Sequence, residues 1–477
     1  MTSQFSPNSE RSIGEELAVT QLAKDLGHKA TRRAPPPRYS DVYPSGSLNK
    51  VTAVRLPGKD LSMLWDVSIQ EGRISAINSH DPRTASCQTS PGVLDGASRL
   101  LAPSLCHAHI HLDKCFLLQD PKFSDLQIEN GDFQEAMELT GQAKSRFEEE
   151  DLLRRGRQLI EESIHYGVTC MRAFVEVDGS VQNKCLNAGL QLKEEFENRC
   201  HVQICAFAQL PLFSGSDGGT EVRRLMKAAA GRAGVDVLGS TPYVEQDLVK
   251  SKMNVMWITR LAISHGKHLD LHLDYFLEVD KQPLIFNVLD IIRERSWPIN
   301  NGKHITLGHC TRLTRFGEHE WRELKRAIGN LPVSFVGLPN SDLFMMRTHE
   351  NVRGTLPIVQ MIKELELEAA IAVNNVGNAF TPQGNCDPLS IASLGVGLYQ
   401  AGTKRDTEIL YEAVSCRAKQ SIGCESTSVT PIIGEAADLV LFDSIDAGWR
   451  CRKSIAEVVY DPQCRRQTIR GGKIVAF

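Results

Sequence analysis

Short apolar runs alternate with longer stretches of helical periodicity through the middle of the chain. The runs are four to twelve residues long and rich in Val, Ile and Leu, which is typical of buried β-strands. We predict strands at 100–111, 168–177, 201–209, 235–242, 268–274, 304–310, 333–338 and 369–375. The stretches after them predict helices, including 152–166, 182–198, 220–233, 248–265, 283–295, 319–329, 357–366 and 388–402.

Eight strands alternating with eight helices predict a (β/α)8 TIM barrel over residues 99–429. A doubly wound sheet is the structural alternative. It commonly uses fewer strands and carries a glycine-rich phosphate loop after its first strand, and this sequence has none there. Residues 115–150 form a long polar insertion after the first strand, where a barrel can use a lid.

The two flanks of the barrel read as β-structure. Residues 49–98 and 430–477 contain short β-branched segments, among them ADLVLFD, SIAEVVY at 454–460, and two strands joined by a turn at Gly471-Gly472. We predict that the flanks meet in one small discontinuous β-domain. Residues 1–48 are polar and rich in Ser, Arg and Pro, and predict an irregular arm with one short helix near residues 13–26.

Composition excludes several classes of protein. The net charge of −4 and the lack of a basic stripe argue against a nucleic-acid partner. No apolar run is long enough to span a bilayer, and the N-terminus lacks the apolar core of a signal peptide. Thirteen cysteines without a CxxC pair indicate free thiols. We expect a cytoplasmic protein with a small-molecule substrate, and the sequence leaves open whether it forms a homo-oligomer.

Histidines stand at the ends of three predicted strands, which is where a barrel enzyme carries its active site. His109 and His111 are two residues apart, so both can project from the same face of the first strand. His272 and His309 end the fifth and sixth strands. Any one of them alone could be an ordinary buried histidine, but the grouping favours ligands for Zn²⁺ or Fe²⁺. His107 lies two residues before His109 and so can project from the same strand face. Its earlier position along the strand favours a buried, hydrogen-bonded role.

The stretch 101–114, which ends in HIHLDK, resembles the opening metal motif of the amidohydrolase superfamily and points to its cytosine deaminase-like branch. The similarity continues in order along about residues 50–477. It recurs at 172–178, 206–209, 239–242, 272–274, 307–309, 374–384 and 436–443.

This resemblance implies a metal-dependent hydrolase barrel with a returning β-domain and one divalent metal, Zn²⁺ or Fe²⁺. It implies that His109, His111 and His272 are metal ligands and that His309 lies beside the metal-bound water. By the same resemblance, Gln209 contacts a polar heterocycle, and Lys114 lies near the pocket mouth or holds a group that contacts the metal.

Three positions depart from the family pattern. Asn374 stands where relatives have a metal-binding Asp, and an amide oxygen can coordinate a metal but cannot serve as a base. Tyr275 replaces a proton-shuttling Glu, so we expect Asp274, on the same strand face as His272, to be a substitute acid or base. The alternative for Asp274 is a buried carboxylate that pairs with an Arg or caps a loop. Phe174 replaces a His and predicts an aromatic pocket wall.

The main hypothesis is therefore a metal-dependent amidohydrolase or deaminase-like enzyme acting on a C–N bond of a cyclic or amide small molecule. One alternative is a cyclase, isomerase or lyase that uses the histidines and Tyr275 as acid and base. A third is a catalytically inactive member that retains only the fold.

Overall fold

A computed structural model describes residues 47–83, 91–346, 352–426, 428–443 and 451–476. Most of the predicted N-terminal arm, including its helix near residues 13–26, lies outside these residues. The described part consists of a barrel and two four-stranded sheets.

The barrel is an eight-stranded parallel sheet, which confirms the predicted fold. Its order is β13-β12-β11-β10-β9-β8-β7-β6. It closes through a parallel bridge between Ile110 and Asn374, where the backbone N–H of His111 donates to the carbonyl of Asn374 at 2.8 Å. The strands are β6 (Leu105–His111), β7 (Val168–Glu176), β8 (His201–Ala208), β9 (Val235–Ser240), β10 (His268–Leu273), β11 (Ile305–His309), β12 (Val333–Gly337) and β13 (Ala369–Ile371).

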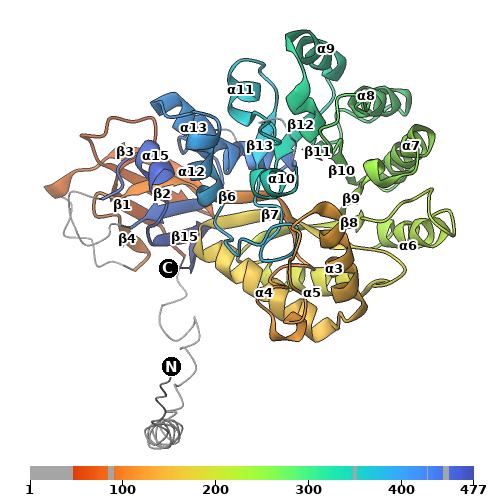
Figure 1. The fold of residues 1–477 in the computed structure, drawn as a ribbon. Helices are drawn as coiled ribbons and strands as arrows, with labels where there is room; N and C mark the ends of the chain where they lie inside the picture. Colours follow the sequence, from red (N-terminus) through yellow and green to blue (C-terminus); the bar gives the residue numbers. More distant parts are fainter. Residues whose placement is uncertain (1–46, 84–90, 347–351, 427, 444–450, 477) are drawn as a thin grey trace, which may run out of the picture. The chain divides into compact units, whose positions relative to one another are not determined.

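Helices surround the barrel strands, as Figure 1 shows for α4 to α9. Nearly every strand residue is buried, because parallel strands are covered on both faces and therefore read as continuous apolar runs. The helices are α4 (Glu149–His165), α5 (Lys184–Phe196), α6 (Thr220–Ala230), α7 (Leu248–Ser264), α8 (Ile285–Glu294), α9 (Glu318–Ile328), α11 (Ile358–Lys363), α12 (Pro388–Leu398), α13 (Lys404–Ala413) and α14 (Cys416–Ser421). None of the helices in the described ranges is both long and apolar enough to cross a membrane.

The chain's two flanks meet beside the barrel, at the left of Figure 1. One sheet has the order β3-β2-β1-β4 and the other β16-β15-β14-β5. Residues of both sheets, such as Val51, Val67, Leu439 and Ile469, share one apolar core. The strands are β1 (Lys50–Val54), β2 (Trp65–Gln70), β3 (Arg73–Ser79), β4 (Val93–Asp95), β5 (Leu100–Pro103), β14 (Leu439–Phe442), β15 (Arg466–Arg470) and β16 (Lys473–Ala476).

Two predicted strands are wrong in detail. The run at 100–111 breaks at Ser104, so β5 pairs antiparallel with β14 in the outer sheet and only β6 belongs to the barrel. The segment 454–460 forms helix α15 (Ile455–Tyr460) instead of a strand. The side chain of Ser454 accepts a hydrogen bond from the backbone of Glu457, and this cap outweighs the β propensity of the valines.

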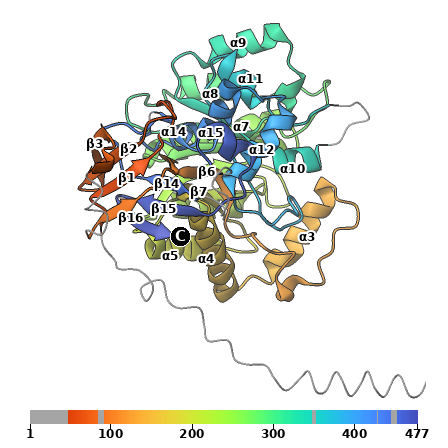
Figure 2. The ribbon, with the colours of Figure 1, turned by 90° about the vertical axis from the view of Figure 1, so that its left-hand side faces the viewer.

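The insertion after β6 contains a helix, α3 (Phe133–Ser145), which the sequence reading did not predict. Figure 2 shows α3 on the same side of the barrel as the short helix α10 (Pro339–Met345), which follows β12. Three 3-10 helices complete the described elements: η2 (Pro121–Phe123), η3 (Pro242–Val244) and η4 (Thr311–Arg315).

Candidate metal centre

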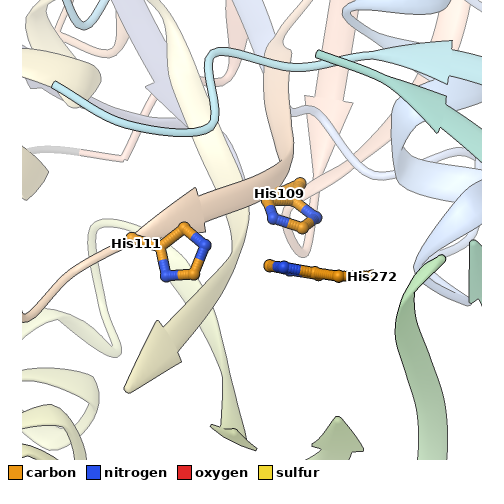
Figure 3. Close-up of side chains that lie close together, drawn as sticks. All are labelled: His109, His111 and His272. Atoms are coloured by element: carbon orange, nitrogen blue, oxygen red, sulfur yellow. The ribbon is translucent and has the colours of Figure 1, made fainter. Parts of the chain in front are cut away.

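Three histidines meet at the C-terminal ends of the barrel strands. His109 and His111 lie on β6 and His272 lies on β10, and one ring nitrogen from each is within 4.8 Å of the others. Figure 3 shows the three rings gathered beside the end of β6. They are the one such group of metal-binding side chains among the described residues.

Each ring of this group has a buried nitrogen with no hydrogen-bond partner among the described residues. These atoms are Nδ1 of His111, Nε2 of His272 and both ring nitrogens of His109, of which a neutral ring offers one as a lone pair. Oδ1 of Asn374 is also unpartnered, while its Nδ2 donates to Oγ of Ser341 at 2.6 Å. Buried polar atoms normally find partners, so a set of unpaired lone pairs at one place fits a cation.

Aromatic rings pack beneath the histidines. Phe174 on β7 stacks on His109 with ring centroids 4.0 Å apart, and Phe207 on β8 lies 4.3 Å from His272. Burial holds the pKa of His109, His111 and His272 well below that of a free imidazole, so the rings are neutral at pH 7. Phe174 is fully buried in this layer of aromatic rings beneath the histidines. We predicted it in the wall of the pocket, but it is not among the residues that line the cavity.

His309 ends β11 and is oriented by a carboxylate that the sequence reading missed. Its Nδ1 lies 2.8 Å from Oδ1 of Asp342, on α10. The other oxygen of Asp342 accepts a hydrogen bond from Thr355 at 2.8 Å. Burial raises the pKa of Asp342, and the hydrogen bond to His309 opposes this rise. Tyr275 packs on His309 with ring centroids 3.9 Å apart, and its hydroxyl donates to the carbonyl of Ser341 at 3.4 Å.

Lys114 follows the histidine motif and is held in a buried ion network. Its Nζ donates to Glu176 at 2.8 Å, and Lys144 on α3 contacts both Glu176 and Asp178. Burial alone would raise the pKa of Glu176, but the two lysines lower it to about 2. The network therefore ties the insertion helix to the end of β7.

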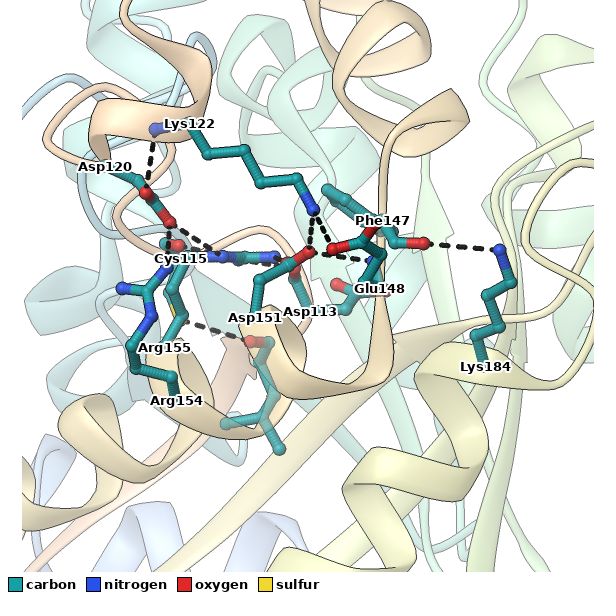
Figure 4. Close-up of polar contacts among 11 residues, drawn as sticks. Asp113, Cys115, Asp120, Lys122, Phe147, Glu148, Asp151, Arg154, Arg155 and Lys184 are labelled. Atoms are coloured by element: carbon teal, nitrogen blue, oxygen red, sulfur yellow. Dashed lines mark hydrogen bonds and ion pairs between the residues drawn. The ribbon is translucent and has the colours of Figure 1, made fainter.

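The backbone on both sides of Lys114 is clamped by one buried arginine. Arg155 on α4 donates to the carbonyls of Asp113 and Cys115 at 2.7 and 2.8 Å, and to Asp151 at 2.8 Å. Figure 4 shows this clamp among the polar contacts that pin the insertion to α4. Lys114 is thus positioned by its neighbours' backbone as well as by Glu176.

Asp274 does not reach the cavity, contrary to the expectation that it replaces the missing acid or base. Its two carboxylate oxygens accept the backbone N–H groups of Leu284 and Ile285 at 2.7 and 3.1 Å, at the start of α8. Burial raises its pKa to about 7. The alternative weighed from the sequence, a buried carboxylate that caps a loop, is what the structure has.

His107 is separate from the histidine group. Its Nε2 lies 3.2 Å from Oγ of Ser163 on α4 and the side chain is fully buried. This is the buried, hydrogen-bonded role that we predicted from its position early in the strand.

A small cavity of about 20 Å³ opens beside the histidines, room for about one water molecule. Phe133 on α3 covers it together with Tyr243, Tyr275 and Phe380, whose rings lie 5.8 to 6.4 Å from that of Phe133. The remaining lining includes Gln209 and the residues His111, Lys114, His272, His309, Ser341, Asn374 and Asn375.

No family model matches the chain, but comparison with known proteins finds relatives whose names describe similar activities. The chain is 22% identical over 423 residues to N-isopropylammelide isopropyl amidohydrolase of a Pseudomonas strain, covering 86% of this chain and 93% of the relative. Among solved structures, 5-methylcytosine deaminase of Klebsiella pneumoniae superposes with a TM-score of 0.75 at 22% identity, over 89% of this chain and 96% of that one. N-isopropylammelide isopropylaminohydrolase of Burkholderia multivorans gives 0.71 at 24% identity, over 90% and 98%.

The fold is thus a TIM barrel with a histidine group at the C-terminal ends of its strands, and the chain resembles an amidohydrolase over most of its length. The resemblance found in the motifs is confirmed, because the relatives are named as an amidohydrolase, an isopropylaminohydrolase and a 5-methylcytosine deaminase.

Proposed function

We propose that this protein is a metal-dependent hydrolase that breaks a C–N bond of a small cyclic molecule. The observation that carries the proposal is the group of unpartnered donor atoms on His109, His111, His272 and Asn374. The names of its relatives, an amidohydrolase and a deaminase, support hydrolysis over the isomerase and lyase alternatives.

We assign the divalent ion to these four side chains. Zn²⁺ and Fe²⁺ both bind neutral imidazoles, and an amide oxygen can complete the set. When bound there, the ion would supply Lewis acidity and would lower the pKa of a water molecule at the site. Asn374 cannot accept a proton at neutral pH, so proton transfer must fall to another residue.

His309 is our candidate for that transfer. It lines the cavity, and Asp342 fixes the orientation of its ring through Nδ1. An imidazole so held can take a proton from the attacking water and return it to the leaving nitrogen. Burial raises the pKa of Tyr275 well above its usual value, so its phenol stays protonated and orients or donates a hydrogen bond.

The substrate must be small and planar to lie between the aromatic cover and the metal site. Lys114, Gln209 and Asn375 line the cavity and can hydrogen-bond a polar ring. Because the cavity holds about one water molecule, α3 and the loop of Phe380 must move apart to admit a ring.

The test is elemental analysis of the purified protein followed by turnover of a panel of aminated and amidated pyrimidine and triazine rings. We expect about one Zn or Fe per chain and hydrolysis of at least one ring, with His272→Ala losing both. A filled site that turns over no ring, amide or imide would contradict hydrolysis. Activity that survives complete removal of the metal would favour the non-hydrolytic alternative.

A further inference from the structure

We infer that the loaded site selects an anion: the ring that binds there carries a negative charge next to the metal-binding side chains. This inference rests on the proposed function, because it concerns the charge of the site when a divalent ion is bound. It specifies the substrate class of that site.

The donor set adds no negative charge. An imidazole binds a metal through the lone pair of its neutral form, and His109, His111 and His272 offer only such lone pairs. Asn374 offers an amide oxygen, which is held in place by the hydrogen bond from its Nδ2 to Ser341 at 2.6 Å. A divalent ion in this set therefore keeps both of its positive charges, whereas one aspartate in place of Asn374 would cancel one.

The residues that line the cavity do not neutralise this positive charge. None of the described residues that line it is an aspartate or a glutamate. The lining has the cation of Lys114 and hydrogen-bond donors on Gln209, Tyr243 and Asn375. Such donors can solvate an anion, and the net positive field at the cavity is then that of the ion.

The nearest carboxylates are engaged elsewhere. Asp342 lies behind His309 and also accepts from Thr355, and it is fully buried. Glu176 and Asp178 together hold Lys114 and Lys144, so these four charges balance. Asp274 accepts two backbone N–H groups at the start of α8. Asp342 and Asp274 keep their negative charges, but neither lines the cavity, where a bound ring would lie beside the ion.

A negative ring is thus favoured over a neutral ring of the same shape. The aromatic rings of Phe133, Tyr243 and Phe380 can stack on a planar ring once the cover has opened, and a delocalised ring anion combines planarity with negative charge. The attraction between the two charges of the ion and one negative charge about 4 Å away is larger than the free-energy difference of a tenfold preference. This holds even at an effective dielectric constant of about 20.

The experiment compares barbiturate, a monoanion at neutral pH, with uracil, a neutral ring of similar shape. The full-length protein is loaded with Zn²⁺, its metal content is measured, and binding of each ring is followed by calorimetry. We expect barbiturate to bind at least about tenfold more tightly than uracil. Asn374→Asp should reduce barbiturate affinity about tenfold or more and change uracil affinity less than about threefold. Asn198→Asp, an exposed substitution of the same charge, controls for the protein's net charge and should change neither.

The outcomes separate this inference from the proposed function. A Zn²⁺-loaded protein that binds both rings equally, prefers uracil, or is unaffected by Asn374→Asp overturns the anion preference and leaves the hydrolase proposal standing. A protein that takes up no divalent metal overturns both. In a Co²⁺-loaded sample, a change in the visible spectrum on adding barbiturate but not uracil would support binding next to the metal, independently of turnover.

Discussion

Asp342 fixes the ring of His309, with Oδ1 of the carboxylate 2.8 Å from Nδ1 of the imidazole. The pair joins two elements, since His309 ends β11 and Asp342 lies on α10 after β12. Thr355 and the backbone N–H of Leu338 hold the second carboxylate oxygen at 2.8 and 3.2 Å. This chain of contacts leaves the imidazole one orientation relative to the cavity.

Replacing Asp342 by Asn should lower kcat about 10- to 100-fold, because the amide can hold the opposite tautomer of His309 and cannot stabilise its protonated form. Metal content should not change, since neither residue is in the donor group. Steady-state kinetics and elemental analysis on the same samples check both statements. Thr355→Val removes one contact of Asp342 and should give a smaller loss in kcat; an unchanged kcat in Asp342→Asn would rule out the assigned role of His309.

Metal retention should distinguish His109 and His272 from His107. Alanine at either of the first two should reduce the bound metal well below one per chain and abolish the dependence of Tm on added Zn²⁺. His107→Asn should keep the metal, because His107 contacts Ser163 and not the histidine group. Elemental analysis and thermal melts with and without a chelator measure the difference. Metal loss in His107→Asn with an intact fold would mean that the donor group is assigned wrongly.

Asp274→Asn should keep kcat within about threefold of the parent protein, since the carboxylate caps the backbone at Leu284 and Ile285 and does not line the cavity. The amide retains one acceptor oxygen, so we expect a loss of stability of about 1 kcal/mol. Turnover and urea unfolding of the variant test this. A loss of kcat near that of a missing general base, about 100-fold or more, would restore Asp274 as an acid or base.

Lys144→Met should destabilise the protein by about 3 kcal/mol at pH 7, because it leaves Glu176 and Asp178 buried with one lysine fewer. The pKa of Glu176 is lowered in the folded protein from 4.5 to about 2, so its contribution to stability is present above about pH 4.5 and is lost as the pH falls towards 2. The difference in the free energy of unfolding between the parent protein and the variant should therefore shrink as the pH falls below about 4.5.

Urea unfolding of the parent and Lys144→Met proteins between pH 7 and pH 3 measures that change. Lys227→Met, at an exposed position on α6, removes the same charge without a buried partner and serves as the control. An equal deficit at every pH would show that Lys144 acts through packing alone.

Phe133→Ala should weaken binding of a planar ring about tenfold while costing little stability, because Phe133 is only half-buried and its contacts lie over the cavity. Calorimetry with the ring that the parent protein binds best measures the affinity. Unchanged affinity would mean that α3 does not cover the bound ligand.

The sequence predicted what repeats along the chain and missed what depends on contacts between distant segments. The barrel strands and His109, His111 and His272 could be found because apolar runs mark strands and strand ends mark the site. Asp342 and Lys144 lie on helices and not at the ends of the apolar strand runs. The pattern of apolar residues therefore does not indicate that either lies near the cavity.

Asp274 was misread for a local reason. Residues on one strand face alternate only while the backbone stays extended, and Asp274 has φ = 47°, so alternation ends at Leu273. The parity that it shares with His272 therefore says nothing about where its carboxylate points. Phe174 was expected at the cavity wall but lies one layer deeper, where it packs on His109.

Asn374 has φ = 69°, in the left-handed region that Asn, Asp and Gly tolerate best. Its backbone also closes the barrel against Ile110, so the conformation is required by the fold whatever the side chain does. Asp tolerates this backbone conformation as Asn does, and it would place a charged oxygen where Asn374 has an uncharged one. In evolutionary terms, a single nucleotide change between Asn and Asp codons would switch the charge of the centre while leaving the barrel seam intact.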